Sequence, residues 1–289
     1  MIKRSAAILL SAALSVTLSS CGKSKNSVTT GNITRDFSER AEAEKNYSFN
    51  TDGISILDIS QDIGDISITY SDSDITELKL SCKSFADDKE VCEDVLSHIS
   101  ADTDMNGGKM VISFVDEDSG EEISQWLSEN IPDSRIELDA ELTVPSYFND
   151  FTAKVNVGNI SLIGLKGAVS AYADVGNITC CGSEISSSSA LGCNTGNVEL
   201  SSNVYTADIS VNIYAGNTTF RLPEKGSENA EIQISSKTGR IHIITEEKEH
   251  SVKDERKENN SHALSIEAQG CNIEASAETG KITIDQEDQ

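Results

Sequence analysis

The stretch VNVGNISLIG, residues 155–164, places a Gly-Asn pair between two short runs of alternating apolar residues. Glycine adopts positive φ without steric cost, and asparagine tolerates the left-handed region better than most other residues. Apolar residues at every second position indicate strands with one buried face. The stretch therefore predicts a strand, a sharp turn at Gly158-Asn159 and a second strand.

The same pattern recurs along the C-terminal half of the chain, in VGNITCCG (175–182), TGNVELSS (195–202) and AGNTTFRL (215–222). Its glycines are evenly spaced from Gly158 to Gly239, and Gly280 follows after roughly two further periods. A period of about 20 residues is typical of architectures in which each repeat buries the face of its neighbour. The turn residues that the pattern predicts are Gly64, Gly158, Asn159, Gly176, Asn177, Gly196, Asn197, Gly216, Asn217, Gly239 and Gly280.

We therefore expect an all-β fold, a parallel β-solenoid with rungs of about 20 residues, in which Ile160, Ile178 and Val198 are buried in register. The alternative is an antiparallel β-sandwich whose hairpins are evenly spaced. Two segments between the early copy at 62–70 and the main repeats have helical periodicity. Residues 84–100 begin with a capping-box arrangement of Ser84 and Asp87, and residues 121–132 end at a proline. The fold should thus carry two short helical insertions.

The N-terminus has the features of an export signal. A basic MIKR precedes an apolar run over residues 5–18, which is too short for an ordinary membrane span. Leu18-Ser19-Ser20-Cys21 resembles the bacterial lipobox, which implies cleavage before Cys21 and acylation of its thiol. An ordinary secretory peptide with a chance cysteine is the alternative. We expect residues 1–20 to be a lipoprotein signal peptide, 21–50 a flexible tether and 51–286 the β-domain, held by lipid on the extracytoplasmic face of the cell membrane.

Two segments carry a resemblance to a known family. ELTVPSYFNDFTAKVNVGNISLIGLKGAVSAYADVGNIT (141–179) resembles the bacterial "putative adhesin" domain, a domain of unknown function with Gly-[Asn/Asp]-[Ile/Val] repeats. GISILDISQDIGDISITYSDSD (53–74) is similar to the N-terminal strand pair of that family, and the resemblance covers roughly residues 47–286. It implies a right-handed β-helix-like fold, surface display and no established activity. The chain departs from the pattern at Thr218, where the family has Ile or Val, and at Arg240 and Lys281, where the family has Asn.

The composition is strongly acidic. The formal net charge is −25, and removal of residues 1–20 leaves 21 basic against 48 acidic residues, a balance of −27. Such a surface repels nucleic acids, anionic lipids and anionic wall polymers, and it favours cationic peptides, basic proteins or divalent cations. A solubilising surface without a partner is the alternative.

Six cysteines remain after Cys21, and export permits disulfides. Cys180 and Cys193 occupy inward repeat positions, where a free thiol packs as a small hydrophobe. We expect buried free thiols, and a Cys82–Cys92 bond is the alternative. The cysteines concerned are Cys82, Cys92, Cys180, Cys181, Cys193 and Cys271.

We expect no catalytic site, no cofactor and no metal site. DTDMNGG (102–108) imitates the start of an EF-hand loop, but its twelfth position is Ser113 rather than glutamate, which indicates a turn. The expected function is that of a non-catalytic cell-envelope lipoprotein in adhesion, recognition or envelope-stress sensing. The alternative is a polysaccharide-active, lyase-like enzyme on a β-helix, for which Lys237 and Arg240 are the basic pair to test.

The lipid anchor gives the first testable prediction. Cys21→Ala should abolish lipid attachment and release unprocessed or soluble protein, because the thiol is the acylation nucleophile. Metabolic labelling with a fatty-acid probe measures this, with Cys82→Ala as a matched cysteine variant that should keep its label. Undiminished labelling of the Cys21 variant would contradict the lipoprotein interpretation.

Overall fold

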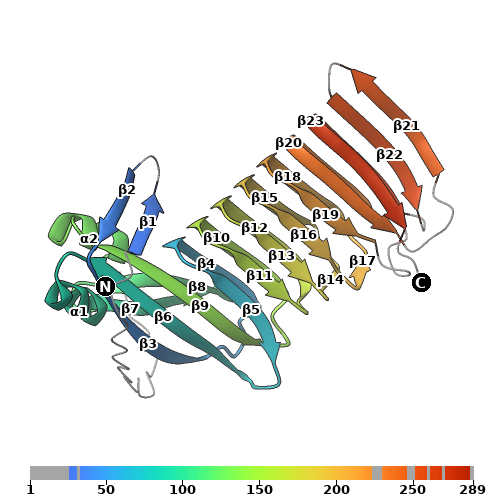
Figure 1. Cartoon of the computed structure of the whole chain (residues 1–289). Helices are drawn as coiled ribbons and strands as arrows, with labels where there is room; N and C mark the ends of the chain where they lie inside the picture. Colours follow the sequence, from blue (N-terminus) through green and yellow to red (C-terminus); the bar gives the residue numbers. More distant parts are fainter. Residues whose placement is uncertain are drawn as a thin grey trace.

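Successive copies of the Gly-Asn pattern lie side by side as parallel strands in the middle of the molecule (Figure 1). The computed structural model describes residues 26–30, 33–222, 230–245, 251–258, 261–268 and 271–286. Within these ranges 21 strands form one mixed sheet, accompanied by a separate two-stranded hairpin and two short helices. The expected all-β fold with two short helices is confirmed.

Each repeat contributes one strand before its turn and one after it. The strands before the turn pair in parallel at an offset of one repeat, so Ala153 lies beside Ala171 and Ala171 beside Leu191. They are β4 (Ile56–Ile63), β10 (Asp150–Val157), β12 (Lys166–Val175), β15 (Ser189–Thr195) and β18 (Ile209–Ala215). The strands after the turn are β5 (Ile66–Ser71), β11 (Ile160–Ile163), β13 (Ile178–Cys181), β16 (Val198–Ser201) and β19 (Thr218–Arg221). Two longer strands, β20 (Glu231–Thr245) and β23 (Cys271–Gln286), run through both positions.

The first copy of the pattern, at Gly64, is separated in the sequence from the copy at Gly158 by a long insertion, but the two copies are neighbours in the stack. Gly64 and Gly158 are far apart in the sequence, yet β4 pairs with β10 and β5 with β11 in the same parallel register. Two further short strands, β14 (Glu184–Ile185) and β17 (Val204–Tyr205), extend the stack on a third side.

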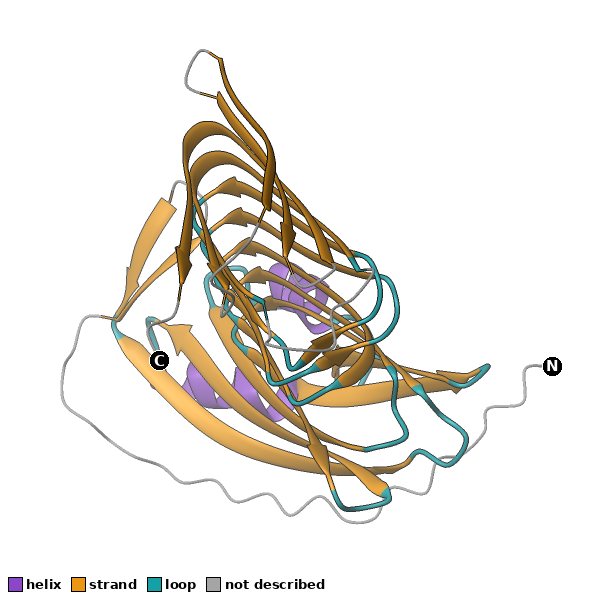
Figure 2. Cartoon of the chain, turned by 90° about the vertical axis from the view of Figure 1, so that its right-hand side faces the viewer, coloured by secondary structure: helices purple, strands orange, loops and turns teal. Residues whose placement is uncertain are grey.

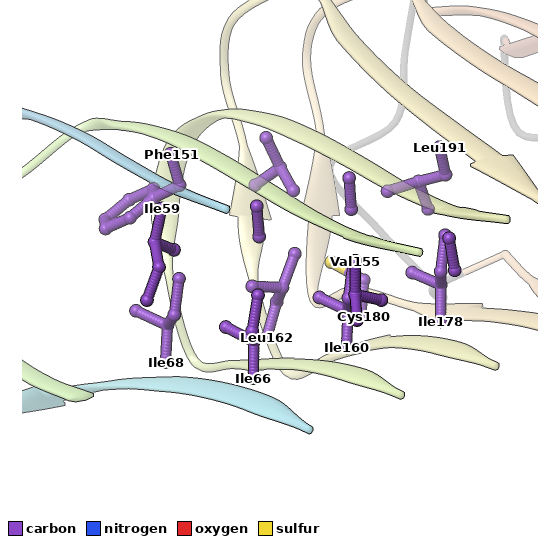
Figure 3. Close-up of a cluster of buried hydrophobic side chains, with 14 of the residues drawn as sticks. Ile59, Ile66, Ile68, Phe151, Val155, Ile160, Leu162, Ile178, Cys180 and Leu191 are labelled. Carbon is purple, nitrogen blue, oxygen red and sulfur yellow. The ribbon is translucent and has the colours of Figure 1, made fainter. Parts of the chain in front are cut away.

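Inward side chains of neighbouring repeats form continuous columns in the core (Figure 3). Ile160 lies beside Ile178, which lies beside Val198, and all three are at most 1% exposed. The buried register that the repeat spacing predicted is therefore confirmed. Thr218 continues this column in place of an apolar residue, and its hydroxyl is buried without a hydrogen-bond partner among the described residues.

The predicted turn glycines also form a column. All of them have φ between +126° and +152°, a range that residues other than glycine rarely adopt. They are Gly64, Gly158, Gly176, Gly196, Gly216, Gly239 and Gly280. From Gly158 onward, a β-carbon on each glycine would overlap the carbonyl oxygen of the glycine before it in the column. Both the backbone conformation and the close approach of neighbouring repeats thus require glycine here.

The residues after these glycines form a hydrogen-bonded ladder. The side-chain oxygen of Asn159 accepts hydrogen bonds from the backbone N–H and the side-chain amide of Asn177, at 3.1 and 2.9 Å. In the same way Asn197 donates both bonds to the side-chain oxygen of Asn177, and Asn217 donates both to that of Asn197. A side-chain amide is suited to this position because it both donates and accepts.

Antiparallel strands and both helices cover the N-terminal end of the stack (Figure 1). The strands are β3 (Glu39–Asn50), β6 (Ile75–Ala86), β7 (Ile99–Asn106), β8 (Lys109–Asp116) and β9 (Arg135–Pro145). The helices are α1 (Lys89–His98) and α2 (Ile123–Asn130). A separate hairpin comprises β1 (Asn26–Thr30) and β2 (Ile33–Phe37).

The capping box expected at Ser84 and Asp87 is wrong. Ser84 is fully buried on β6, where it pairs with both β3 and β9, so the strand continues through it. Helix α1 instead begins after Asp88, whose carboxylate accepts a hydrogen bond from the N–H of Glu90 at 2.7 Å. Asp88 is thus the N-cap.

The flexible tether assigned to residues 21–50 is wrong for residues 39–50. They form β3, which pairs with β6 along its whole length and buries Ala41, Tyr47 and Phe49. The alternation of apolar and polar residues in β3 is not evident in the sequence, because a charged residue, Lys45, occupies an inward position. Its side chain is buried, and its ammonium donates a hydrogen bond to the carbonyl oxygen of Ile99.

An antiparallel hairpin covers the C-terminal end of the stack. Strand β22 (Ser261–Ala268) pairs with β23, and β21 (Ser251–Glu258) pairs with β22 (Figure 1). Figure 2 views the molecule from this end of the stack. The sequence of β21, SVKDERKE, is rich in charge, which discourages further strand pairing at an open edge. No helix among the described residues is long and apolar enough to cross a membrane.

The glycine column gives a prediction about stability. Gly176→Ala should destabilise the fold by more than about 4 kcal/mol, because the new methyl group would overlap the backbone of Gly158. Gly182 is the matched control, because it also has positive φ, +64°, but a β-carbon there would meet nothing closer than 3.9 Å. Gly182→Ala should therefore cost only about 1–2 kcal/mol. Chemical denaturation measures both, and equal losses would mean that the close approach contributes nothing.

Candidate binding surface

The predicted lipidation site, Cys21, lies outside the described residues. Lipid attachment and the signal peptide therefore stay predictions, and the structure supplies its own candidate sites elsewhere.

A groove crosses the outward face of the strands that precede the turns. Its volume is about 540 Å³, and it is lined by residues of β12, β15, β18, β20 and β23. Because side chains alternate along a strand, the groove is built from the positions between the buried ones. In the middle of it β15 presents Ala190 and Gly192, so the small side chains of one strand leave a hollow between its neighbours.

Tyr172 forms one side of this groove. It lies beside Gly192 in the register of β12 and β15, and its ring leans over that glycine. The ring is supported by backbone on one face, while the residue as a whole remains 40% exposed. An aromatic side chain that covers a glycine on the next strand is a common way to protect the backbone there. Here it also leaves a flat apolar surface open to solvent.

Tyr214, on β18, is a second exposed ring in the groove. It is 56% exposed, and the ammonium of Lys237 on β20 lies 4.7 Å from the ring centroid. This cation–π contact holds both side chains in place. Lys237 was one of the two basic residues singled out in the sequence, and the structure brings it to the groove.

Polar side chains join these aromatic positions. The amide of Asn194 donates to the carboxylate of Asp174 at 2.5 Å, and the amide of Asn212 donates to the hydroxyl of Ser210 at 2.8 Å. The hydroxyl of Ser235 donates to the side-chain oxygen of Asn212. Fixed amide and hydroxyl groups beside apolar rings are typical of small-molecule and saccharide sites.

Arg240 does not join Lys237 in a shared site. Its backbone N–H donates to the side-chain oxygen of Asn217 at 3.2 Å, and in the register it lies beside Lys281. Arg240 therefore ends the asparagine ladder, whereas Lys237 contacts Tyr214. Of the basic pair named for the alternative lyase-like function, Lys237 lines the groove and Arg240 does not.

A second cavity, of about 400 Å³, lies beneath α2. Ile63, Phe114 and Leu127 are among its apolar lining residues. Gln61 also lines it, and its side-chain oxygen is buried with no hydrogen-bond partner in the described part of the chain. This cavity joins the helical insertion to the first rungs of the stack.

A histidine–aspartate pair lies at the junction of the two helices with β8. The Nδ1 atom of His98 is 2.7 Å from a carboxylate oxygen of Asp116, which is 1% exposed. The other carboxylate oxygen accepts hydrogen bonds from the N–H and the hydroxyl of Ser119, at 2.7 and 2.6 Å. Because Ser119 contacts the aspartate and not the imidazole, the arrangement lacks the nucleophile–base contact of a serine hydrolase. The imidazole stacks on Trp126 at 4.2 Å, so the group ties three elements together.

These contacts set the pKa of Asp116. Burial would raise the pKa of the carboxyl group, but the hydrogen bonds from Ser119 and His98 outweigh burial and hold it below its ordinary value. The folded state thus favours the ionised carboxylate.

The remaining sequence candidates are structural. The EF-hand-like segment forms the β7–β8 hairpin, with Gly107 and Gly108 at positive φ in a two-residue turn, as the missing glutamate indicated. Within the described part of the chain, no three His, Cys, Asp or Glu side chains are grouped to hold a metal ion. His242 pairs with Asp285 at 2.7 Å on the exposed surface.

The described cysteines are free thiols. Cys82, Cys92, Cys180 and Cys193 are buried and Cys181 is half-buried, so the Cys82–Cys92 bond is absent. Burial raises the pKa of Cys82 to about 12 and also raises that of Cys180. Both thiols are therefore protonated and unreactive at neutral pH.

The groove is not predicted by the sequence pattern, because the repeat fixes only the inward positions. In the same register the outward positions place Tyr172, Gly192 and Asn212 on three adjacent strands. The sequence feature that indicates the groove is the pair of small outward residues in one repeat, Ala190 and Gly192.

The chain is similar in fold to two solved structures, at low sequence identity. One is a "putative cell adhesion protein" from Clostridium sporogenes, 9% identical, with a TM-score of 0.34 over 85% of this chain and 100% of that chain. The other is a "putative adhesin" from Bacteroides fragilis, 11% identical, with a TM-score of 0.35 over 84% of this chain and 97% of that chain. No protein-family model and no curated protein sequence matches the chain.

The Asp116 cluster gives a prediction about pH. A carboxyl with a lowered folded-state pKa adds stability above its unfolded pKa of about 3.9, and this stability is lost as the pH falls toward the folded value. Asp116→Asn should therefore lower the free energy of unfolding by about 1–3 kcal/mol at pH 7. The difference from the parent protein should shrink below about pH 4.

The neighbouring Asp118 supplies the control. Its side chain is 87% exposed and 4.0 Å from His98, so Asp118→Asn should leave the free energy of unfolding nearly unchanged at each pH. Denaturant titrations at several values between about pH 3 and about pH 7, which span the ordinary aspartate pKa of about 3.9, measure both variants. A pH-independent difference for Asp116→Asn would contradict the assigned role of its charge.

Proposed function

We propose that the protein is a non-catalytic recognition module of the cell envelope, held at the membrane by lipid on Cys21. The groove with two exposed tyrosines, Tyr172 and Tyr214, supports this proposal most directly. Exposed aromatic side chains in a hollow, with polar groups around them, mark binding surfaces on soluble proteins. We propose that this surface serves in adhesion, recognition or envelope-stress sensing.

The architecture supports a binding role. We propose that the parallel middle of the sheet is a short β-solenoid, because its repeats pair in register at a nearly constant sequence offset. Solenoids of this kind present long regular surfaces, whose outward residues vary without disturbing the core. The antiparallel strands at either end then serve as caps.

Charge supports a choice of partner. The chain carries −25 at neutral pH, so its surface outside the groove favours cationic peptides or basic proteins and disfavours nucleic acid. A lyase-like enzyme remains the competing function. It needs a positioned base, and Lys237 is occupied by its contact with Tyr214.

The test combines binding with a search for turnover. Purified protein should bind a cationic peptide more weakly at high than at low salt, since charges are screened over about 8 Å at physiological ionic strength. Incubation with envelope glycans and peptides should yield no new reducing ends and no cleavage. Product that is lost in Lys237→Ala or Arg240→Ala would replace the recognition module by an enzyme.

A further inference from the structure

We propose that the groove across β12, β15, β18, β20 and β23 binds a neutral glycan chain. This inference rests on the proposed recognition function and names the chemical class of its ligand. It is carried by the charge, the exposed rings and the backbone pairing of the groove.

The charge of the groove excludes strongly ionic ligands. Among the described side chains that line it, Lys237 and Glu278 are the charged ones, and their signs cancel. The register places them on the neighbouring strands β20 and β23, since the residues on either side of them are paired. A cationic ligand finds no cluster of carboxylates here, and an anionic polymer is repelled by the whole chain. The occupant that fits is uncharged.

The two rings supply flat apolar surfaces at a fixed separation. Tyr172 and Tyr214 lie on β12 and β18 with β15 between them, about 10 Å apart along the stack. Because Asn212 is the residue in register with Tyr172, Tyr214 is also offset by two residues, about 7 Å, along the strand. The ring of Tyr172 packs over Gly192, and the residue remains 40% exposed. The ring of Tyr214 contacts the ammonium of Lys237, and the residue remains 56% exposed. A sugar ring has a face of C–H groups that packs on such an aromatic surface, and its hydroxyl groups stay at the rim.

The polar groups suit hydroxyl recognition. The side chains of Asn194, Asn212 and Ser235 carry both donors and acceptors, which a sugar hydroxyl requires because it too donates and accepts. They lie on three adjacent strands, so the hydrogen-bonding groups extend along the groove. A linear chain of sugars uses such a row better than a single sugar does.

The backbone of the groove argues against a peptide bound as an added strand. Strands β12, β15, β18 and β20 each pair on both sides with neighbours of the stack. Their main-chain groups are used in these pairings, so no edge is open for β-augmentation within the groove. A glycan needs only the side chains, which are free to point outward.

Three neutral hexasaccharides, namely cellohexaose, maltohexaose and N-acetylated chitohexaose, serve as probes with the full-length mature protein. We expect at least one of them to bind in calorimetry, with an affinity that is unchanged between low and high salt. Tyr172→Ala and Tyr214→Ala should each weaken that binding about tenfold or more, as loss of an aromatic anchor does. Gly192→Gln should do the same, because its side chain would fill the hollow and its β-carbon would lie 3.0 Å from the Tyr172 ring and press on it.

Ile163→Ala is the matched control. Ile163 is 47% exposed on β11, outside the groove, and its loss should leave glycan affinity unchanged. Thermal unfolding midpoints near that of the parent protein show that each variant is folded. If a tyrosine variant is unstable, Gly192→Gln still tests whether the groove binds the glycan.

The outcomes separate the glycan inference from the proposed function. Failure of all three probes to bind, or binding that the groove variants do not alter, overturns the glycan inference. In that case, salt-dependent binding of a cationic peptide still supports the recognition module. Glycan binding followed by cleavage supports the site and overturns the non-catalytic function instead.

Discussion

The close approach of backbone to backbone at the glycine turns is the constraint on which the rest of the stack depends. Each turn brings a glycine against the carbonyl oxygen of the glycine one repeat earlier, with no room for a β-carbon. Such an approach is possible in one register only, because a shift by one residue would place a side chain in the gap. The inward columns follow from it, since a fixed turn sets which residues face the core on both flanking strands.

The ladder beside the glycines has a direction, and its two ends differ in chemistry. It starts at carboxylates, which accept only. Asp139 accepts from the N–H of Asp65, and Asp65 accepts from both amide groups of Asn159. It ends at Arg240, which donates its backbone N–H and has no side-chain acceptor to offer a further repeat. The amides between do both, so the ladder runs over the repeats that carry asparagine and ends at Arg240, the first residue that replaces it.

The parts of the fold that a single repeated periodicity controls could be predicted from the sequence. The parts that depend on contacts between elements far apart in the chain could not. Alternation and spacing predicted the buried register of Ile160, Ile178 and Val198, because both are local properties repeated many times. The strand β3 was missed because a lysine occupies an inward position, and its buried ammonium is satisfied by a carbonyl far along the chain. The start of α1 was misplaced because Ser84 resembles a cap in sequence but is held in a strand by partners on both sides.

The groove shows why such a fold separates stability from recognition. Inward residues fix the register and are buried, whereas outward residues of neighbouring repeats meet only through the stacking. A hollow at Gly192 therefore needs no change in the core, and the ring of Tyr172 covers the exposed backbone that the missing side chain leaves. The surface is acidic over the chain as a whole but balanced within the groove. In the proposed function, long-range attraction of charged molecules and short-range selection of a ligand would therefore fall to different residues, and the outward residues can change while the glycine column keeps the fold.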